Sequence, residues 1–266
     1  MAPAIHWQRE GQVARVVIRN PARFNAMTRS MWRELRRVFD DLQALIHGAH
    51  GESEPGADLR VVVVQGASGH FCAGGDISEY PAFRFDEARL RGFHEDEVWG
   101  GLAAMLACDL PIVAAIAGNC MGAGVEIASC CDLRIASQAA RFGAPIAKLG
   151  FPMAPRELQL VGSRLGDTVA RAMLLEAALY DAPALLQAGF LTRLCAPDQV
   201  QAEADACAAR VASLAPQAAR LHKQSLRALG QGTPVDVVVQ TAYAYADSAE
   251  HREGVQAFLA KRPPVF

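Results

Sequence analysis

The sequence predicts an α/β fold that is followed by a region of helices alone. Two observations carry this prediction. Short β-branched or apolar segments alternate with helical patterns as far as about residue 195, which is typical of parallel strands joined by crossover helices. From Pro197 onward the pattern is helical almost throughout and rich in alanine. We therefore expect residues 1–196 to form an α/β core and residues 197–266 to form a helical C-terminal region.

Composition indicates an ordinary globular protein and narrows its partners. The chain has 266 residues, of which 52% are hydrophobic and 20% charged, enough for a sizeable core. A formal net charge of −2 gives no reason to expect nucleic acid or an anionic membrane as the main partner. No apolar run reaches the length of a transmembrane helix, and the N-terminus does not resemble a secretory signal. We therefore expect a cytoplasmic protein.

The seven cysteines point the same way. Most of them lie in apolar contexts, and no CxxC pair occurs. This pattern favours buried free thiols in a reducing compartment over disulfides or a zinc site. We expect no metal centre.

The first third of the chain predicts two strands and one long helix. Residues 12–19 read as a strand that ends at Asn20-Pro21. Thr28 is the expected N-cap of a helix over residues 29–46, because an apolar stripe runs along that segment. The stripe consists of Trp32, Leu35, Phe39, Leu42 and Ile46. Residues 47–58 are expected to be a surface loop, and the β-branched run 59–65 a strand buried on both faces.

The middle of the chain continues the alternation. Residues 78–91 have mixed polarity and one proline, and we interpret them as a partly disordered segment or a flexible wall. The segment from 145 to 155 reads as a loop. The other expected elements are strands at 112–117, 133–136, 140–143 and 190–194, and helices at 95–108, 123–130, 156–165, 168–176 and 182–188.

Two glycine turns, each placed after a predicted strand and the second opening a helix, are the first candidates for chemistry. They are Gly74-Gly75 and Gly122-Ala123-Gly124. Unpaired backbone N–H groups at such junctions bind anions, and residues without bulky side chains let a ligand approach closely. If the parent strands are neighbours, the two turns together stabilise an enolate or oxyanion. Either turn alone is better explained as an ordinary tight turn. Glu126, in the first turn of the second helix among apolar neighbours, is a candidate acid or base.

Taken with their flanking residues, the two turns resemble the crotonase (enoyl-CoA hydratase/isomerase) superfamily. The matching segments are NPARFNA at 20–26, FCAGGD at 71–76, AGNCMGAGVE at 117–126, CDLRIA at 131–136, FG at 142–143 and EGVQAFLAKR at 253–262. The resemblance covers essentially the whole chain. It implies a spiral of ββα units with a C-terminal helical trimerisation region, and homotrimers or dimers of trimers. It also implies an acyl-CoA thioester as substrate and no redox cofactor.

The same resemblance assigns site residues. The two oxyanion N–H groups fall on Gly75 and Ala123, and Glu126 matches the first of two catalytic glutamates in the hydratases. The implied CoA-binding or substrate-binding positions are Arg23, Asn25, Ala73, Gly74, Asp76, Ile77, Gly122, Ile146, Phe258 and Lys261. Arg23 and Lys261 are candidate contacts to CoA phosphates, the lysine across a subunit boundary; surface charges without a ligand are the alternative.

One residue departs from the family's pattern. The second glutamate of the hydratases would fall at position 146, where this chain has Ile146. The candidate replacements are His70, Asp76, His94, Glu95 and Glu157. Of these, Asp76 reads as a helix cap, His94 and Glu95 as surface residues, and Glu157 as a surface residue at a helix start. Hydration, isomerisation and decarboxylation therefore stay open, as does a non-catalytic acyl-CoA-binding or scaffold protein.

Overall fold

The computed structural model describes residues 2–48 and 58–266, and its centre is a six-stranded sheet. Strand β1 pairs with β2 in antiparallel fashion, and every other neighbouring pair in this sheet is parallel. The order is β1 (Ala4–Glu10), β2 (Val13–Arg19), β3 (Val61–Gly66), β4 (Ile112–Ile116), β6 (Leu133–Ser137) and β9 (Arg193–Cys195). This confirms the expected α/β class with parallel pairing.

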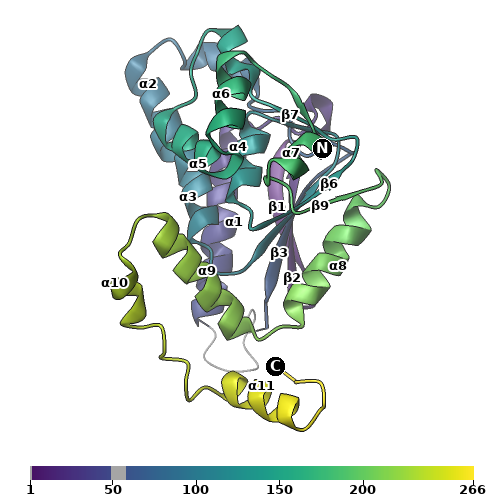
Figure 1. Ribbon diagram of the computed structural model, residues 1–266. Helices are drawn as coiled ribbons and strands as arrows, with labels where there is room; N and C mark the ends of the chain where they lie inside the picture. Colours follow the sequence, from purple (N-terminus) through teal and green to yellow (C-terminus); the bar gives the residue numbers. More distant parts are fainter. Residues whose placement is uncertain (1, 49–57) are drawn as a thin grey trace.

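Helices cover both faces of this sheet (Figure 1). Val62 and Val64 of β3 pack in a cluster with α1 (Arg29–Gly48) and α3 (Trp99–Ala107). Val61 and Val63 point the other way and pack with α8 (Val200–Ala212). All four valines are fully buried, each stabilising the fold by about 1.5–3 kcal/mol relative to exposure. The prediction of a strand buried on both faces is confirmed.

Helix α1 begins and packs as its sequence predicts. The Thr28 hydroxyl oxygen accepts a hydrogen bond from the Met31 N–H at 3.2 Å, which satisfies one of the helix's first unpaired donors. The five residues of the predicted apolar stripe are all buried. Of the loop expected at 47–58, residues 47–48 belong to α1, residue 58 is a turn, and residues 49–57 lie outside the part of the chain that the structure describes.

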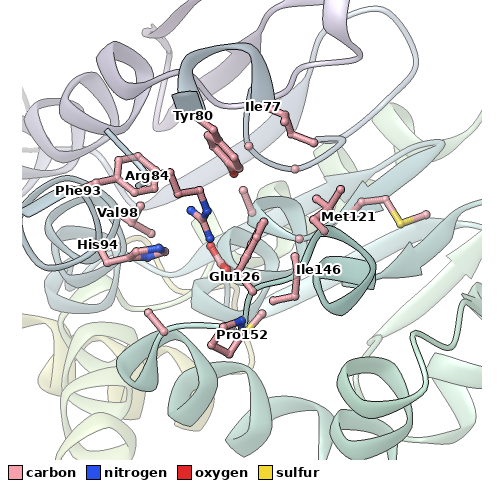
Figure 2. A pocket seen from close by; sticks show the side chains of 18 of the residues that line it. Ile77, Tyr80, Arg84, Phe93, His94, Val98, Met121, Glu126, Ile146 and Pro152 are labelled. Atoms are coloured by element: carbon pink, nitrogen blue, oxygen red, sulfur yellow. The ribbon is translucent and has the colours of Figure 1, made fainter. Parts of the chain in front are cut away.

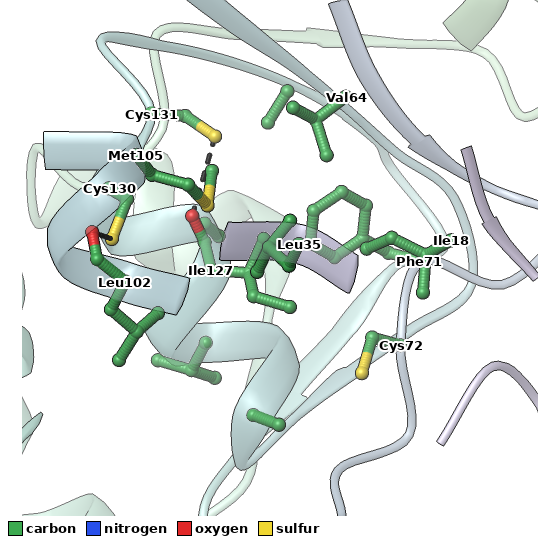
Figure 3. Close-up of a cluster of buried hydrophobic side chains, with 14 of the residues drawn as sticks. Ile18, Leu35, Val64, Phe71, Cys72, Leu102, Met105, Ile127, Cys130 and Cys131 are labelled. Carbon is green, nitrogen blue, oxygen red and sulfur yellow. Dashed lines mark hydrogen bonds between the residues drawn. The ribbon is translucent and has the colours of Figure 1, made fainter. Parts of the chain in front are cut away.

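The sulfur atoms lie where their apolar neighbours predict. Six of the seven cysteines are buried, Cys195 is partly buried, and all are free thiols. Figure 3 shows Cys72, Cys130 and Cys131 among the side chains of the main core. The Cys131 thiol donates to the Ile127 carbonyl at 3.4 Å, as a small apolar residue with a weak donor does in a helix.

Three strands were not expected from the sequence: β1, β5 (Asn119–Met121) and the two-residue β8 (Tyr180–Asp181). β1 is an edge strand with only Ile5 buried among its seven residues, so it lacks a clear alternation. β5 lies within the segment expected to be a glycine turn. It is bracketed by Gly118 and Gly122, both with positive φ, and it joins a second sheet with β7 (Arg141–Gly143) and β8.

The segment expected to be a flexible wall is folded into short helices. A 3₁₀ helix, η2 (Ile77–Ala82), is followed by α2 (Glu87–Gly92), and a π-helical turn, η3 (Phe93–Val98), leads directly into α3. The expected helix at 95–108 therefore begins earlier and contains an irregular first turn. The other helices are η1 (Pro21–Arg23), α4 (Ala123–Cys130), η4 (Pro145–Leu149), α5 (Pro155–Leu165), α6 (Asp167–Leu175) and α7 (Ala182–Gln187).

Three C-terminal helices follow α8, and the last two extend away from the sheet in Figure 1. They are α9 (Pro216–Gly230), α10 (Val235–Val239) and α11 (Ala249–Leu259). Arg227 of α9 pairs with the buried Asp109 at 2.8 Å and ties this region to the core. The helical C-terminal region is confirmed, whereas its division from the core at residue 197 stays a prediction, since α8 packs on the sheet. No helix among the described residues is long and apolar enough to cross a membrane.

Candidate active site

The two glycine turns lie side by side because their parent strands are neighbours. β3 and β4 pair in parallel, and the pairing is taken up again beyond them by a bridge between Cys72 and Cys120. The Cys72 N–H donates to the Asn119 carbonyl at 3.0 Å, and the Cys72 carbonyl accepts from the Met121 N–H at 2.8 Å. A Cβ atom at Gly122 would lie 3.6 Å from the Gly74 Cα atom, so the two turns are in contact.

Two backbone donors at these turns are unpaired. Within residues 2–48 and 58–266, no atom accepts a hydrogen bond from the N–H of Gly75 or of Ala123. The Gly75 donor is held in place by hydrogen bonds on both sides, from the Met27 N–H to the Gly74 carbonyl and from the Asp76 N–H to the Met27 carbonyl, each 2.8 Å. Ala123 opens α4, where the first N–H groups have no partner within the helix. Both residues line one cavity of about 250 Å³.

This arrangement depends on glycine at two positions. Gly122 has φ +47° and ψ −110°, a conformation that residues with a side chain rarely adopt. At Gly124 a Cβ atom would lie 2.5 Å from the Cys72 carbonyl oxygen, so any side chain would push α4 away from the first turn. The glycines therefore fix the distance between the two donors.

Glu126 lies in the first turn of α4 and lines the same cavity. Burial raises the pKa of its carboxyl group to about 8, and the nearby carboxylate of Glu157 contributes to this increase. The group is therefore mostly protonated near neutral pH and is suited to give or take a proton.

A second candidate for proton transfer comes from residues that were interpreted as surface side chains. The helix start at Glu157 is as predicted, but its side chain is only 1% exposed because the first turn of α5 packs inward, with Leu160 and Val161, against α4. Its Oε1 atom lies 3.0 Å from Nδ1 of His94 in η3. Its Oε2 atom has no hydrogen-bond partner in the described part of the chain. The surface interpretation of Glu157 and His94 is therefore wrong.

The pair of Glu157 and His94 leaves one imidazole nitrogen for the cavity. With Nδ1 bonded to a carboxylate, the neutral ring carries its proton there and Nε2 is an acceptor. His94 lines the cavity, and Figure 2 shows its ring directed toward the space around Glu126. Two groups able to move protons, the Glu126 carboxyl and the His94 imidazole, thus meet in one cavity.

The other suggested replacements are engaged elsewhere. Nδ1 of His70 accepts a hydrogen bond from the Asn119 N–H at 3.1 Å and supports the turn before β5. The Glu95 carboxylate pairs with Arg156 at 2.7 Å on the surface, as expected. Asp76 caps η2 by accepting from the Ser78 N–H at 3.1 Å, which confirms its predicted structural role.

Ile146 occupies the cavity wall near Glu126, as Figure 2 shows. It belongs to η4, where its N–H donates to the Ala144 carbonyl at 2.8 Å. The position at which the family's second glutamate was expected is therefore filled by an apolar side chain that faces the cavity.

The predicted binding residues divide into two groups. Those that line the cavity with the catalytic candidates are Ala73, Gly74, Ile77, Gly122 and Ile146. Asp76 does not line it. Asn25 is fully buried, and its side-chain amide donates to the carbonyls of Ala67 at 2.6 Å and His70 at 2.7 Å. It acts on the site by holding the loop before the first glycine turn.

Three predicted binding residues lie apart from the cavity. Arg23 is exposed at the end of η1. Phe258 of α11 is 83% exposed, and Lys261 follows that helix. Figure 1 shows α11 at the opposite end of the molecule from α4. Their assignment to ligand binding stays a prediction.

Several side chains that line the cavity were not expected from the sequence. They are Trp32, Tyr80, Arg84, Phe93, Val98, Met121, Pro145, Leu149, Phe151, Pro152, Met153 and Ala154. Tyr80 lies nearest to the oxyanion donors, because a Cβ atom at Gly75 would lie 2.3 Å from its hydroxyl oxygen. For Tyr80 and Arg84 the only sequence signal is the mixed polarity of residues 78–91, which predicts a wall and not its residues.

Comparison with known proteins places the chain in a family. The family model described as "Enoyl-CoA hydratase/isomerase" matches residues 8–266. The chain therefore belongs to the enoyl-CoA hydratase/isomerase family, as its sequence motifs predict. It is 30% identical over 264 residues to the short-chain-enoyl-CoA hydratase of Clostridium acetobutylicum, covering 96% of this chain and 94% of that protein.

Solved structures agree with this assignment. An enoyl-CoA hydratase/carnithine racemase from Magnetospirillum magneticum is 34% identical with a TM-score of 0.90, covering 98% of this chain and 94% of that one. An enoyl-CoA hydratase from Bacillus anthracis is 23% identical with a TM-score of 0.86, covering 98% of each chain, and shows likeness of fold alone. The expected crotonase-like fold is confirmed.

Proposed function

We propose that the chain catalyses the reversible addition of water to the double bond of a short enoyl-CoA thioester. The observation that carries this proposal is the meeting, in one cavity, of two unpaired backbone donors with two proton-transfer groups. The thioester carbonyl oxygen lies between the N–H groups of Gly75 and Ala123. A cavity of about 250 Å³ suits a short acyl group, since it is smaller than the roughly 300–1,000 Å³ typical of whole drug-sized ligands.

The contact of His94 with Glu157 and the raised pKa of Glu126 assign their roles. His94 accepts a proton from water through Nε2 as the water oxygen adds to the β-carbon, and Glu157 stabilises the imidazolium that forms. Negative charge moves to the thioester oxygen, where each backbone donor contributes roughly 2.7–4 kcal/mol. Glu126 holds its proton near neutral pH and transfers it to the α-carbon. Water is consumed, no electrons leave the system, and the reaction needs no redox cofactor.

We also propose an oligomeric state and a cellular compartment, each supported by one feature outside the cavity. The C-terminal region carries large exposed apolar side chains, such as Leu226, Tyr243 and Phe258, and covering them by copies of the same chain favours a homotrimer or a dimer of trimers. Seven free thiols favour a reducing compartment such as the cytoplasm.

The test is hydration of crotonyl-CoA, followed by the loss of the ultraviolet absorbance of its conjugated thioester. Replacing Glu126→Gln should lower kcat/KM by about 100- to 10,000-fold, because the variant cannot transfer the proton. The matched control is Glu87→Gln, which alters an exposed i,i+4 ion pair with Arg91 and should leave the rate unchanged.

Two other outcomes would redirect the proposal. A wild-type protein that binds crotonyl-CoA but hydrates no enoyl-CoA in a panel of chain lengths would be a binding or scaffold protein. A Glu126→Gln variant with full hydratase activity would show that the proton comes from another group.

A further inference from the structure

Arg84 is the one strongly cationic group among the described residues that line the cavity, and the proton-transfer steps do not use it. Its backbone N–H donates to the Tyr80 carbonyl at 2.8 Å, which fixes the turn after η2. The guanidinium carbon lies 3.5 Å from the centroid of the Phe151 ring and 4.6 Å from that of Tyr80. The planar group therefore contacts two aromatic rings that stand at 70° to each other, and Figure 2 shows it directed toward the interior.

The Arg84 side chain has no anionic partner. Within residues 2–48 and 58–266, no carboxylate lies within ion-pair distance of its guanidinium, and no oxygen accepts a hydrogen bond from it. Arg29 in the same region provides a contrast. It lies over the Phe83 ring at 4.9 Å, but it also pairs with Glu97 at 2.6 Å. Burial without such a partner lowers the pKa of Arg84, which means that the charged form is under-stabilised there.

The other charges of the cavity do not supply this partner. Glu126 is mostly protonated near neutral pH, and the Glu157 carboxylate is engaged with His94. An incoming anion would thus meet an unpaired guanidinium without strong repulsion from the catalytic carboxyl. A guanidinium binds a carboxylate through two parallel hydrogen bonds, which matches its fixed planar geometry.

We propose that Arg84 binds a carboxylate at the far end of the acyl chain, so that the preferred substrate is a short dicarboxylic acid linked to CoA through one of its carboxyl groups. This inference rests on the proposed function, because it takes the acyl group to lie beside Glu126 in the cavity that Arg84 lines. Arg84 would then determine specificity for the substrate and leave the oxyanion and proton-transfer chemistry to other residues.

The experiment measures equilibrium binding by calorimetry, so that it does not depend on turnover. The probes form two matched pairs that differ only by a terminal carboxylate: butyryl-CoA with glutaryl-CoA, and propionyl-CoA with succinyl-CoA. We expect the wild-type protein to bind the carboxylated member of at least one pair about 10-fold more tightly or better, the effect of one charge-assisted contact. In Arg84→Gln this ratio should fall to about 1, while the affinity for the uncarboxylated probe is retained.

Two further variants keep the test decisive. Arg91→Gln removes a cation from the same segment, where it is exposed and paired with Glu87, and should keep the wild-type ratio. Arg84→Lys keeps the charge without the two-point geometry and should give an intermediate ratio. Circular dichroism and thermal unfolding show whether Arg84→Gln folds. If it does not fold, the binding ratio of Arg84→Lys is compared with that of the wild-type protein instead.

Each remaining outcome overturns the inference. Equal affinities within both pairs for the wild-type protein would exclude a carboxylate site. A preference retained in Arg84→Gln would assign it to another residue. An equal loss of affinity for both members of a pair would place Arg84 on the CoA moiety. If folded wild-type protein bound none of the four probes, the proposed function itself would fail, a result distinct from the other three.

Discussion

Two walls of the cavity differ in construction. One, which we call the backbone wall, consists of residues 73–75 and 121–124, held together by pairing beyond β3 and β4. The other, the side-chain wall, consists of residues 77–98 on η2, α2 and η3, and it places Tyr80, Arg84 and His94 at the cavity. The backbone wall offers donors that any carbonyl oxygen can use. The side-chain wall offers groups that depend on residue identity, so we infer that it sets the reaction and the substrate.

A large effect is expected from damage to the backbone wall. In Gly124→Ala the added Cβ atom would lie 2.5 Å from the Cys72 carbonyl oxygen, so α4 must move and carry the Ala123 donor with it. Loss of one oxyanion donor should lower kcat/KM for an enoyl-CoA by about 100- to 1,000-fold.

A glycine-to-alanine change elsewhere in the chain serves as the control for Gly124→Ala. Gly162 lies inside α5, and a Cβ atom added there would meet no other atom within 4 Å. Gly162→Ala should therefore keep full activity and slightly raise stability, because alanine favours the helix more than glycine does. Equal activities for the two variants would show that the contact between the turns does not matter.

The next effect concerns the residue that supports the side-chain wall from α5. In Glu157→Gln, His94 loses its charged partner and Glu126 loses a neighbouring negative charge. We expect kcat/KM to fall about 10- to 100-fold, as for other residues that orient a catalytic group. The pKa of Glu126 should also fall, which would move the corresponding limb of the pH–rate profile to lower pH.

The control for this change is Glu95→Gln, since Glu95 is exposed and pairs with Arg156. A pH–rate profile of Glu157→Gln that overlays the wild-type profile would mean that the two carboxyl groups do not interact.

A smaller effect, a gain of activity, is expected from placing a new proton-transfer group on η4, which belongs to neither wall. His94→Gln should be nearly inactive, and adding Ile146→Glu should restore activity by at least about 10-fold, because a carboxyl group then faces the cavity from η4. The control is the double variant that combines His94→Gln with Ile146→Gln. Its glutamine side chain has about the size of glutamate but cannot act as a base. If both double variants recover equally, the gain comes from shape and not from proton transfer.

The smallest effect concerns stability. The pKa of Glu126 is about 8 in the folded protein and near 4.5 in the unfolded chain, so the folded state keeps its proton to higher pH. Its stabilising contribution is complete below about pH 4.5 and is lost as pH rises toward 8. Between about pH 5.5 and 7.5, the free energy of unfolding of wild type relative to Glu126→Gln should fall by at most ~1.4 kcal/mol per pH unit. Urea denaturation of both proteins at three pH values measures this, and parallel curves would contradict the raised pKa.

The backbone wall could be predicted from the sequence, and the side-chain wall could not. Gly74-Gly75 and Gly122-Ala123-Gly124 are recognisable because strand, glycine and helix signals are local, and β-branched runs identify the strands that bring them together. Glu157 and His94 are 63 residues apart, and nothing local distinguishes a buried glutamate at a helix start from an exposed one. Their contact follows from the packing of α5 on α4, which is a property of the whole fold.

The strands that were not predicted are defined by their partner strands more than by their own residues. β1 forms through its partner β2 and buries little of its own surface. β5 has only three residues and is defined by the glycines on either side and by its pairing with β7.

The π-helical turn η3 has an evolutionary consequence. A π turn accommodates one more residue than an α turn and is equivalent to a single-residue insertion into a helix. Deleting one residue between Phe93 and Val98 would restore regular α-helix and rotate the preceding positions by about 100° relative to α3. Such a deletion would turn the His94 imidazole away from the cavity while the N–H groups of Gly75 and Ala123 stayed in place. On the proposed mechanism, a one-residue change in the length of this segment would therefore remove one proton-transfer group from the cavity. The backbone donors that hold the thioester oxygen would keep their residues.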